Sequence, residues 1–170
     1  KMYTQLFIIA VCLIMSAYFS ATETAFSTLN RIRVKNLAEK GSKKAELTLK
    51  LADNFDTLLS TILIGNNIVN IAASALTTTL IISLGLGTYT AVGTGILTLL
   101  ILIFGEITPK TLATIHAEKM SFVYAPVISL LTKLLTPVIF LLNKLSGVFL
   151  LLFHVDPNAK TNVMTENELL

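Results

Sequence analysis

The chain has few charged residues and almost no cysteine, tryptophan or histidine. Charged side chains make up 14% of the 170 residues, against about a quarter in soluble domains, whereas hydrophobic residues make up 54%. The single cysteine, Cys12, excludes an intrachain disulfide. Without tryptophan, any aromatic belt at a membrane surface must come from Tyr and Phe. This composition predicts one membrane-embedded bundle rather than a soluble domain.

Three apolar runs are long enough to cross a bilayer, which takes about 20 residues for a helix. We place these spans at about residues 4–27, 57–83 and 89–110. The alternative for the first run is a secretory signal peptide. Lys1 alone makes a poor basic leader, however, and the segment SATETAFS (20–27) is an awkward cleavage region.

Residues 30–56 are rich in charge and predict a pair of short helices in water, separated by Gly41-Ser42. Seven of the thirteen basic residues lie there, namely Arg31, Arg33, Lys35, Lys40, Lys43, Lys44 and Lys50. Basic residues concentrate in cytoplasmic loops. We therefore expect this pair in the cytoplasm, the N-terminus outside and the C-terminus inside a plasma (inner) membrane.

Residues 121–155 leave two interpretations open. The segment is apolar enough for a fourth span, but Lys133 and Lys144 would share one helical face and Pro137 is expected to break the run between them. A lysine stripe on an apolar helix favours a belt lying in the membrane interface. The polar tail, residues 156–170, is interpreted as a linker toward a further soluble domain. The predicted fold is thus an all-α membrane protein with three transmembrane helices, a cytosolic helical hairpin and an interfacial belt.

Polar residues inside the first span follow a helical stripe. Ser16, Ser20, Glu23 and Ser27 are spaced by four, three and four residues, so they share one helix face. Serines in membrane helices also serve close helix packing, which is the competing interpretation of Ser16 and Ser20. Glu23 alternatively lies in water at the cytoplasmic surface.

The second span contains GNNIVN (65–70), in which Asn66 and Asn70 share a face and Asn67 points elsewhere. Amides facing lipid are costly. We expect Gly65 to break the helix and free a carbonyl toward a cavity, as in membrane ion sites. The alternative is that the asparagines bond two helices together.

The third span ends in FGEITPK (104–110), where Glu106 is the main candidate residue because an ionisable side chain at membrane depth is functional by default. We expect Glu106 to be the one formal charge of a cation site. Gly105 allows close approach, and Pro109 lacks the backbone N–H that a carbonyl one turn earlier needs.

The pooled ligand atoms are hydroxyl, amide, carbonyl and carboxylate oxygens, with no His or Cys. Such a set suits hard cations, and composition alone leaves Mg²⁺, Ca²⁺ and Na⁺ open. No Ser–His pair, Asp pair or HExxH arrangement occurs within the spans. We therefore expect no enzyme activity and no nucleic-acid partner.

Together, SATETAFS, GNNIVN and FGEITPK make residues 1 to about 155 resemble the transmembrane domain of the CorC/CNNM (cyclin-M) magnesium transporter family. The resemblance implies a homodimer that exports Mg²⁺, with Na⁺ entry as the driving force. It also implies cytosolic CBS-pair and CorC-type modules, and the VMTENELL tail (163–170) resembles the start of the linker to them.

Carried onto this sequence, the resemblance implies a largely dehydrated Mg²⁺ held between the three spans. The implied Mg²⁺ ligands are Ser16, Ser20, Gly65, Asn66, Asn70 and Glu106. The candidates for gating or Na⁺ coupling are Glu23, Ser27, Thr94, Thr98, Gly105, Pro109 and Lys110. Two other functions stay open, a membrane anchor and dimerisation platform without transport of its own, and a passive cation channel.

Overall fold

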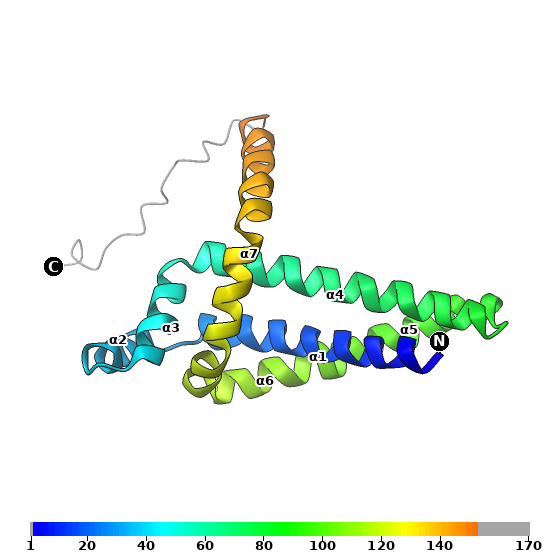
Figure 1. The fold of residues 1–170 in the computed structure, drawn as a ribbon, viewed down its shortest axis with the longest axis horizontal. Coiled ribbons are helices and arrows are strands. Elements are labelled where there is room, and N and C mark those ends of the chain that lie inside the picture. Colours follow the sequence, from blue (N-terminus) through cyan, green and yellow to red (C-terminus); the bar gives the residue numbers. More distant parts are fainter. Residues whose placement is uncertain (1, 153–170) are drawn as a thin grey trace. The chain divides into compact units, whose positions relative to one another are not determined.

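The computed structural model describes residues 2–152, with side chains through residue 148, and every regular element in that range is a helix. The helices are α1 (Met2–Ser27), α2 (Arg31–Glu39), α3 (Lys43–Asp53), α4 (Phe55–Ser83), α5 (Thr90–Leu100), α6 (Thr108–Ile115) and α7 (Ala117–Leu152) (Figure 1). A 3₁₀ turn, Gly87–Tyr89, precedes α5, and a π-helical segment, Ile101–Ile107, joins α5 to α6. The predicted all-α class is confirmed for the described residues.

The chain divides into two compact units, residues 1–134 and 135–170. The first unit contains α1 to α6 and the first half of α7, and it holds every residue of the candidate site. The second unit begins within α7. The predicted linker, residues 156–170, lies outside the described residues, as do residues 153–155 of the predicted belt.

Four helical stretches in the described part of the chain are long and apolar enough to cross a membrane. They are Met2–Ser27, Phe55–Ser83, Gly87–Ile115 and Ala117–Val148. The first three coincide with the predicted spans, and the fourth is the segment that we assign to an interfacial belt. The count of three spans therefore stays a prediction.

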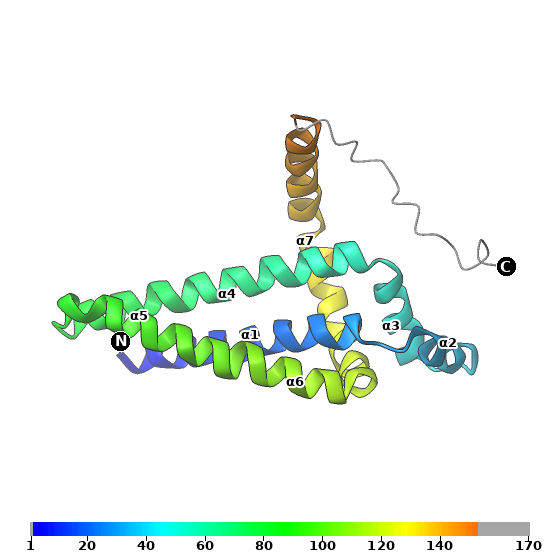
Figure 2. The same cartoon turned by 180° about the vertical axis from the view of Figure 1, so that it is seen from behind.

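Helix α1 is the central helix of the first unit. It contacts α4, α6 and the π-helical segment, and the opposite views of Figures 1 and 2 both show it between α4 and α6. Phe19 and Phe26 of α1 are buried in a cluster with Leu58 and Ile62 of α4. Large apolar side chains such as Phe7 stay exposed, as expected of helix surfaces that face lipid rather than water.

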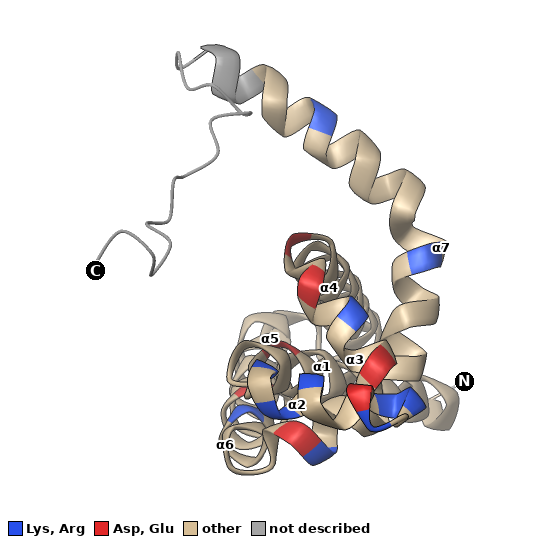
Figure 3. Ribbon diagram, turned by 90° about the vertical axis from the view of Figure 1, so that its left-hand side faces the viewer, with Lys and Arg blue, Asp and Glu red and all other residues tan. Residues whose placement is uncertain are grey.

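Helices α2 and α3 contact each other and lie within residues 30–56, where we expect a pair of short helices; their place in the cytoplasm stays a prediction. Each begins at a side chain that caps free backbone N–H groups. Asn30 Oδ1 accepts a hydrogen bond from Arg33 N at 3.0 Å, and Ser42 Oγ accepts one from Ala45 N at 3.4 Å. Figure 3 views the first unit from the end that carries these helices, where most of its Lys, Arg, Asp and Glu residues gather.

The expected helix break at Gly65 is wrong. Helix α4 runs from Phe55 to Ser83 without interruption, so GNNIVN is helical throughout. Gly65 instead faces α1, because a Cβ built there would lie 2.5 Å from Phe19 Cε1. The absence of a side chain lets the buried Phe19 ring pack against the α4 backbone.

The expected break at Pro137 is also wrong, since α7 is continuous from Ala117 to Leu152. Pro126 and Pro137 each remove one backbone donor, but neighbouring turns hold the helix together. Within the first unit, Ala125 and Ile128 of α7 are fully buried in the same cluster as Phe26. The Tyr18 hydroxyl of α1 also donates to the Tyr124 carbonyl at 3.1 Å.

Candidate functional site

Three apolar elements meet at Ser16. Its hydroxyl donates a hydrogen bond to Asn66 Oδ1 of α4 at 3.0 Å. A Cβ built on Gly105, in the π-helical segment, would lie 3.1 Å from Ser16 Oγ. Ser16 is only 1% exposed. Residues from three separate apolar segments of the sequence therefore come together at one buried point.

A cavity of about 270 Å³ opens between α4, α5 and the π-helical segment. Its polar lining consists of Asn70, Ser74, Thr98 and Glu106, and its apolar lining consists of Leu97, Ile101 and Leu102. The cavity shares the π-helical segment with the Ser16 junction, because Gly105 and Glu106 are consecutive. It therefore adds a carboxylate, an amide and two hydroxyls to the oxygens gathered around Ser16.

Lys110 lies between two carboxylates. Its ammonium is 3.4 Å from Glu106 Oε1 and 3.4 Å from Glu23 Oε2. The side chains of Lys110, Glu106 and Glu23 are 36%, 42% and 33% exposed, so solvent screens these ion pairs and each contributes little to stability. Two further charged groups, Lys110 and Glu23, therefore lie beside Glu106, which we expected to be the one formal charge of the site.

The polar stripe on α1 runs from the junction at Ser16 to the ion pair of Glu23 with Lys110. Ser20 lies one turn after Ser16 on the same face, and Glu23 follows three residues later. Ser20 is 2% exposed, and its hydroxyl makes no hydrogen bond to another residue within the described range. Its oxygen is not fully enclosed, since Thr48 Oγ1 is the one fully enclosed side-chain oxygen without a partner among the described residues. The Ser20 hydroxyl therefore keeps some accessible surface on this stripe.

The backbone around Glu106 is π-helical, a rare conformation that often marks functional sites. The N–H of Thr108 donates to the Ile103 carbonyl, five residues earlier. In this register Pro109 would bond to Phe104, but proline has no N–H to donate. The irregular backbone that we expected at Gly65 therefore lies in the third apolar segment instead.

Several predicted residues lie apart from these contacts. Gly65 packs against Phe19, and Ser27, at the exposed end of α1, donates to the Thr24 carbonyl. Thr94 donates to the Thr90 carbonyl within α5. Pro109 lines a separate, mainly apolar cavity beside α1 and α7.

Ser74, which shares the cavity with Asn70 and Glu106, is not among the residues predicted from the sequence. The available sign was its spacing, because residues 66, 70 and 74 follow one another at intervals of four and share a helix face. No local sequence pattern predicts the ion pair of Lys110 with Glu23, because their positions in the sequence differ by 87.

Apolar helices of spanning length around a buried cluster of oxygen groups define a multi-pass helical membrane protein. The family model for the cyclin M transmembrane N-terminal domain matches residues 7–170. The chain therefore belongs to the CNNM family, as the resemblance of its three motifs predicted. This family is one of membrane proteins and not a known enzyme family, which is consistent with a role in membrane transport.

Curated relatives come from bacteria and plants. A UPF0053 protein of Haemophilus influenzae is 40% identical over 166 residues, covering 98% of this chain and 40% of the relative. The UPF0053 inner membrane protein YfjD of Escherichia coli is 37% identical over 155 residues, covering 91% and 35%. A chloroplastic DUF21 domain-containing protein of Arabidopsis thaliana is 35% identical over 162 residues, covering 95% and 24%. The chain thus spans 40% or less of the length of these relatives.

Proposed function

We propose that this domain exports Mg²⁺ across the membrane, coupled to Na⁺ entry, and binds a largely dehydrated Mg²⁺ between α1, α4 and the π-helical segment. The observation that carries the proposal is the meeting of Ser16, Asn66 and Gly105 beside the cavity that Glu106 lines. These groups offer oxygen ligands, which hard cations such as Mg²⁺ prefer. A cation transporter is therefore the function that fits this membrane domain best.

The spacing of the oxygens supports Mg²⁺. Mg²⁺ binds oxygen at about 2.0–2.1 Å in an octahedron, so neighbouring ligand oxygens lie about 2.9 Å apart. Ser16 Oγ and Asn66 Oδ1 lie 3.0 Å apart. This separation is that of their hydrogen bond, and it is close to one edge of an octahedral shell, so the two oxygens can accept the ion with little movement once the hydroxyl proton turns away. Ser20, Asn70 and Glu106 supply further oxygens along the same elements.

Gly65 has no side chain, so in this proposal its ligand atom is the backbone carbonyl oxygen. Its carbonyl lies inside a continuous helix, where the N–H of Val69 is its normal partner. A carbonyl keeps a second lone pair for a cation. The carbonyls of the π-helical segment around Phe104, which lack the Pro109 donor, are the alternative backbone ligands.

Lys110 allows a bound cation to be released as well as attracted. Glu23, Lys110 and Glu106 together carry a net charge of −1, which attracts a cation, while the ammonium of Lys110 offsets part of the attraction and keeps binding weak. Mg²⁺ entering from the cytoplasm meets this group, sheds water to the serine and asparagine oxygens, and leaves when the outer side opens. Na⁺ binding favours the inward-facing state by differential affinity, with Ser27, Thr94 and Thr98 as its candidate contacts.

The proposed topology has three spans, α7 in the membrane interface, and α2 and α3 in the cytoplasm because of their basic residues. In a Cys12→Ala background, a membrane-impermeant thiol reagent applied from outside should label Thr88→Cys and spare Lys40→Cys. Labelling of Lys160→Cys from outside would contradict the interfacial position of α7, because a fourth crossing reverses the side of the C-terminus.

The wider assembly is a further part of the proposal. We propose that the chain forms a homodimer in the bilayer and that cytosolic CBS-pair and CorC-type modules accompany it in the full-length protein. The shares of the relatives that the chain leaves uncovered are long enough for such modules.

Flux in liposomes tests the proposal. The purified chain is reconstituted with Mg²⁺ on one side and Na⁺ on the other, and Mg²⁺ movement is followed with a fluorescent indicator. We expect flux that rises with the opposing Na⁺ gradient and stops when the gradient is removed. Saturable flux that ignores Na⁺ would identify a passive channel, and no flux from a correctly folded dimer would identify an anchor.

A further inference from the structure

A second cavity, outside the candidate cation site, lies between α3, the beginning of α4 and the first half of α7. It has a volume of about 270 Å³ and is lined by Leu47, Lys50, Leu51, Asn54, Thr57, Leu58, Ser129, Thr132 and Lys133. All nine residues belong to the first unit. None of the functions discussed above uses this cavity.

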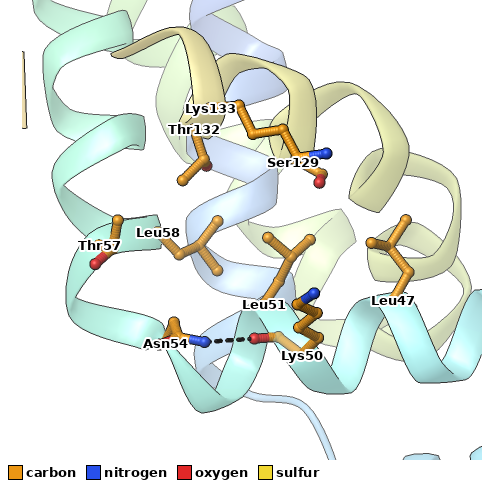
Figure 4. A pocket seen from close by; sticks show the side chains of 9 residues that line it. All are labelled: Leu47, Lys50, Leu51, Asn54, Thr57, Leu58, Ser129, Thr132 and Lys133. Atoms are coloured by element: carbon orange, nitrogen blue, oxygen red, sulfur yellow. Dashed lines mark hydrogen bonds between the residues drawn. The ribbon is translucent and has the colours of Figure 1, made fainter. Parts of the chain in front are cut away.

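The lining of this cavity combines positive charge with an apolar floor. Figure 4 shows Lys50 reaching into the cavity from α3 and Lys133 from α7, on opposite sides. Leucines from α3 and α4 lie between them, and no lining residue is acidic. Neither ammonium forms an ion pair with a carboxylate of the described residues. Two such lysines, with the Ser129 hydroxyl one helical turn before Lys133 on α7, suit an anion that carries several oxygens.

The position of the cavity along the chain indicates where that anion comes from. Asn54 is the N-cap of α4, so the cavity lies where a candidate span begins and the basic helices α2 and α3 end. Lipid phosphates lie at this level of a membrane, and basic pockets between helices bind anionic headgroups there. On α7, Leu130 and Leu134 flank Lys133 and are 69% and 71% exposed, which leaves apolar surface for an acyl chain.

We propose that this cavity binds the phosphate of an anionic phospholipid, held by Lys50 and Lys133, with an acyl chain over the exposed leucines of α7. The site ties α3, α4 and α7 to one lipid molecule. It shares no lining residue with the cavity at Glu106. A negative result for lipid binding would therefore not argue against the proposed transport, and the reverse also holds.

Native mass spectrometry of the 170-residue chain in detergent tests this site with phosphatidylglycerol, phosphatidylcholine of the same acyl chains, and inorganic phosphate. A lysine near a membrane surface contributes about 1 kcal/mol to binding an anionic lipid. The double variant Lys50→Gln/Lys133→Gln should therefore bind phosphatidylglycerol about thirty-fold more weakly. Binding of phosphatidylcholine should stay weak and unchanged.

Two matched variants separate the cavity from general basic attraction. Lys40→Gln/Lys44→Gln removes the same charge from the C-cap of α2 and from α3, outside the cavity, and should leave phosphatidylglycerol binding within about threefold of wild type. Ser129→Phe fills the cavity, keeps both lysines and should weaken binding, with melting temperature as the check on folding. Equal losses in both double variants, wild-type binding by Ser129→Phe, or displacement of the lipid by millimolar inorganic phosphate would overturn the proposal.

Discussion

Replacing Glu106 with glutamine should lower Mg²⁺ affinity by at least about a hundredfold and reduce Mg²⁺ flux to background. Glutamine keeps the volume and one oxygen of the side chain but removes its charge. A pair of unit charges about 4 Å apart contributes about 4 kcal/mol at an effective dielectric constant of about 20, and 1.4 kcal/mol is a factor of ten. Mg²⁺ carries two charges, which doubles the figure to about 8 kcal/mol. Because Glu106 is 42% exposed, we discount it to about half, and about 4 kcal/mol is more than a hundredfold in affinity.

The matched control for this variant is Glu118→Gln. Glu118 is also a carboxylate in an ion pair, 2.7 Å from Arg33 Nε, but it lies outside the candidate site. Isothermal titration with Mg²⁺ and liposome flux should show wild-type behaviour for this control. Unchanged flux in Glu106→Gln at equal expression would remove the carboxylate from the mechanism, whereas lost flux with unchanged affinity would make it a gating residue only.

Replacing Lys110 with glutamine should have the opposite effect on affinity. The variant leaves Glu23 and Glu106 without the ammonium that lies 3.4 Å from each, so the local charge changes from −1 to −2. We expect Mg²⁺ to bind about tenfold more tightly, since solvent screens part of the added attraction. Flux should fall because release of the tightly held ion becomes slow.

Two variants control the charge change at Lys110. Lys110→Arg preserves the charge and should keep affinity within about threefold of wild type. Lys119→Gln removes an exposed lysine of α7 that has no ion pair among the described residues, and it should change neither affinity nor flux. Weaker Mg²⁺ binding in Lys110→Gln would show that Lys110 positions Glu106 rather than competing with the cation.

Local sequence patterns predicted most of the fold. Apolar runs of spanning length predicted α1, α4 and the segment from α5 to α6. The break expected at Gly41-Ser42 lies between α2 and α3. The wrong predictions concern continuity, at Gly65 and Pro137. At Gly65 the tertiary environment overrides local propensity, because Phe19 packs against the glycine. At Pro137 the helix continues because proline removes only one backbone donor and the neighbouring turns keep theirs.

The candidate site was predictable where residue type alone identifies a polar group in an apolar span. This applies to Ser16, Asn66 and Glu106, which the structure places at one junction and its adjoining cavity. The ion pair of Lys110 with Glu23 depends on how α1 packs against α6, which no local pattern encodes. The π-helical segment likewise has no period in the sequence that distinguishes it from an α-helix.

The most direct test of the central claim is a crystal structure of the chain with Mn²⁺ in place of Mg²⁺, phased to reveal anomalous scattering. The account predicts one strong peak about 2.2 Å from Ser16 Oγ and Asn66 Oδ1, with the Glu106 carboxylate also bound to the ion. A peak that touches residues of only one helix, or no peak at saturating Mn²⁺, would contradict the account.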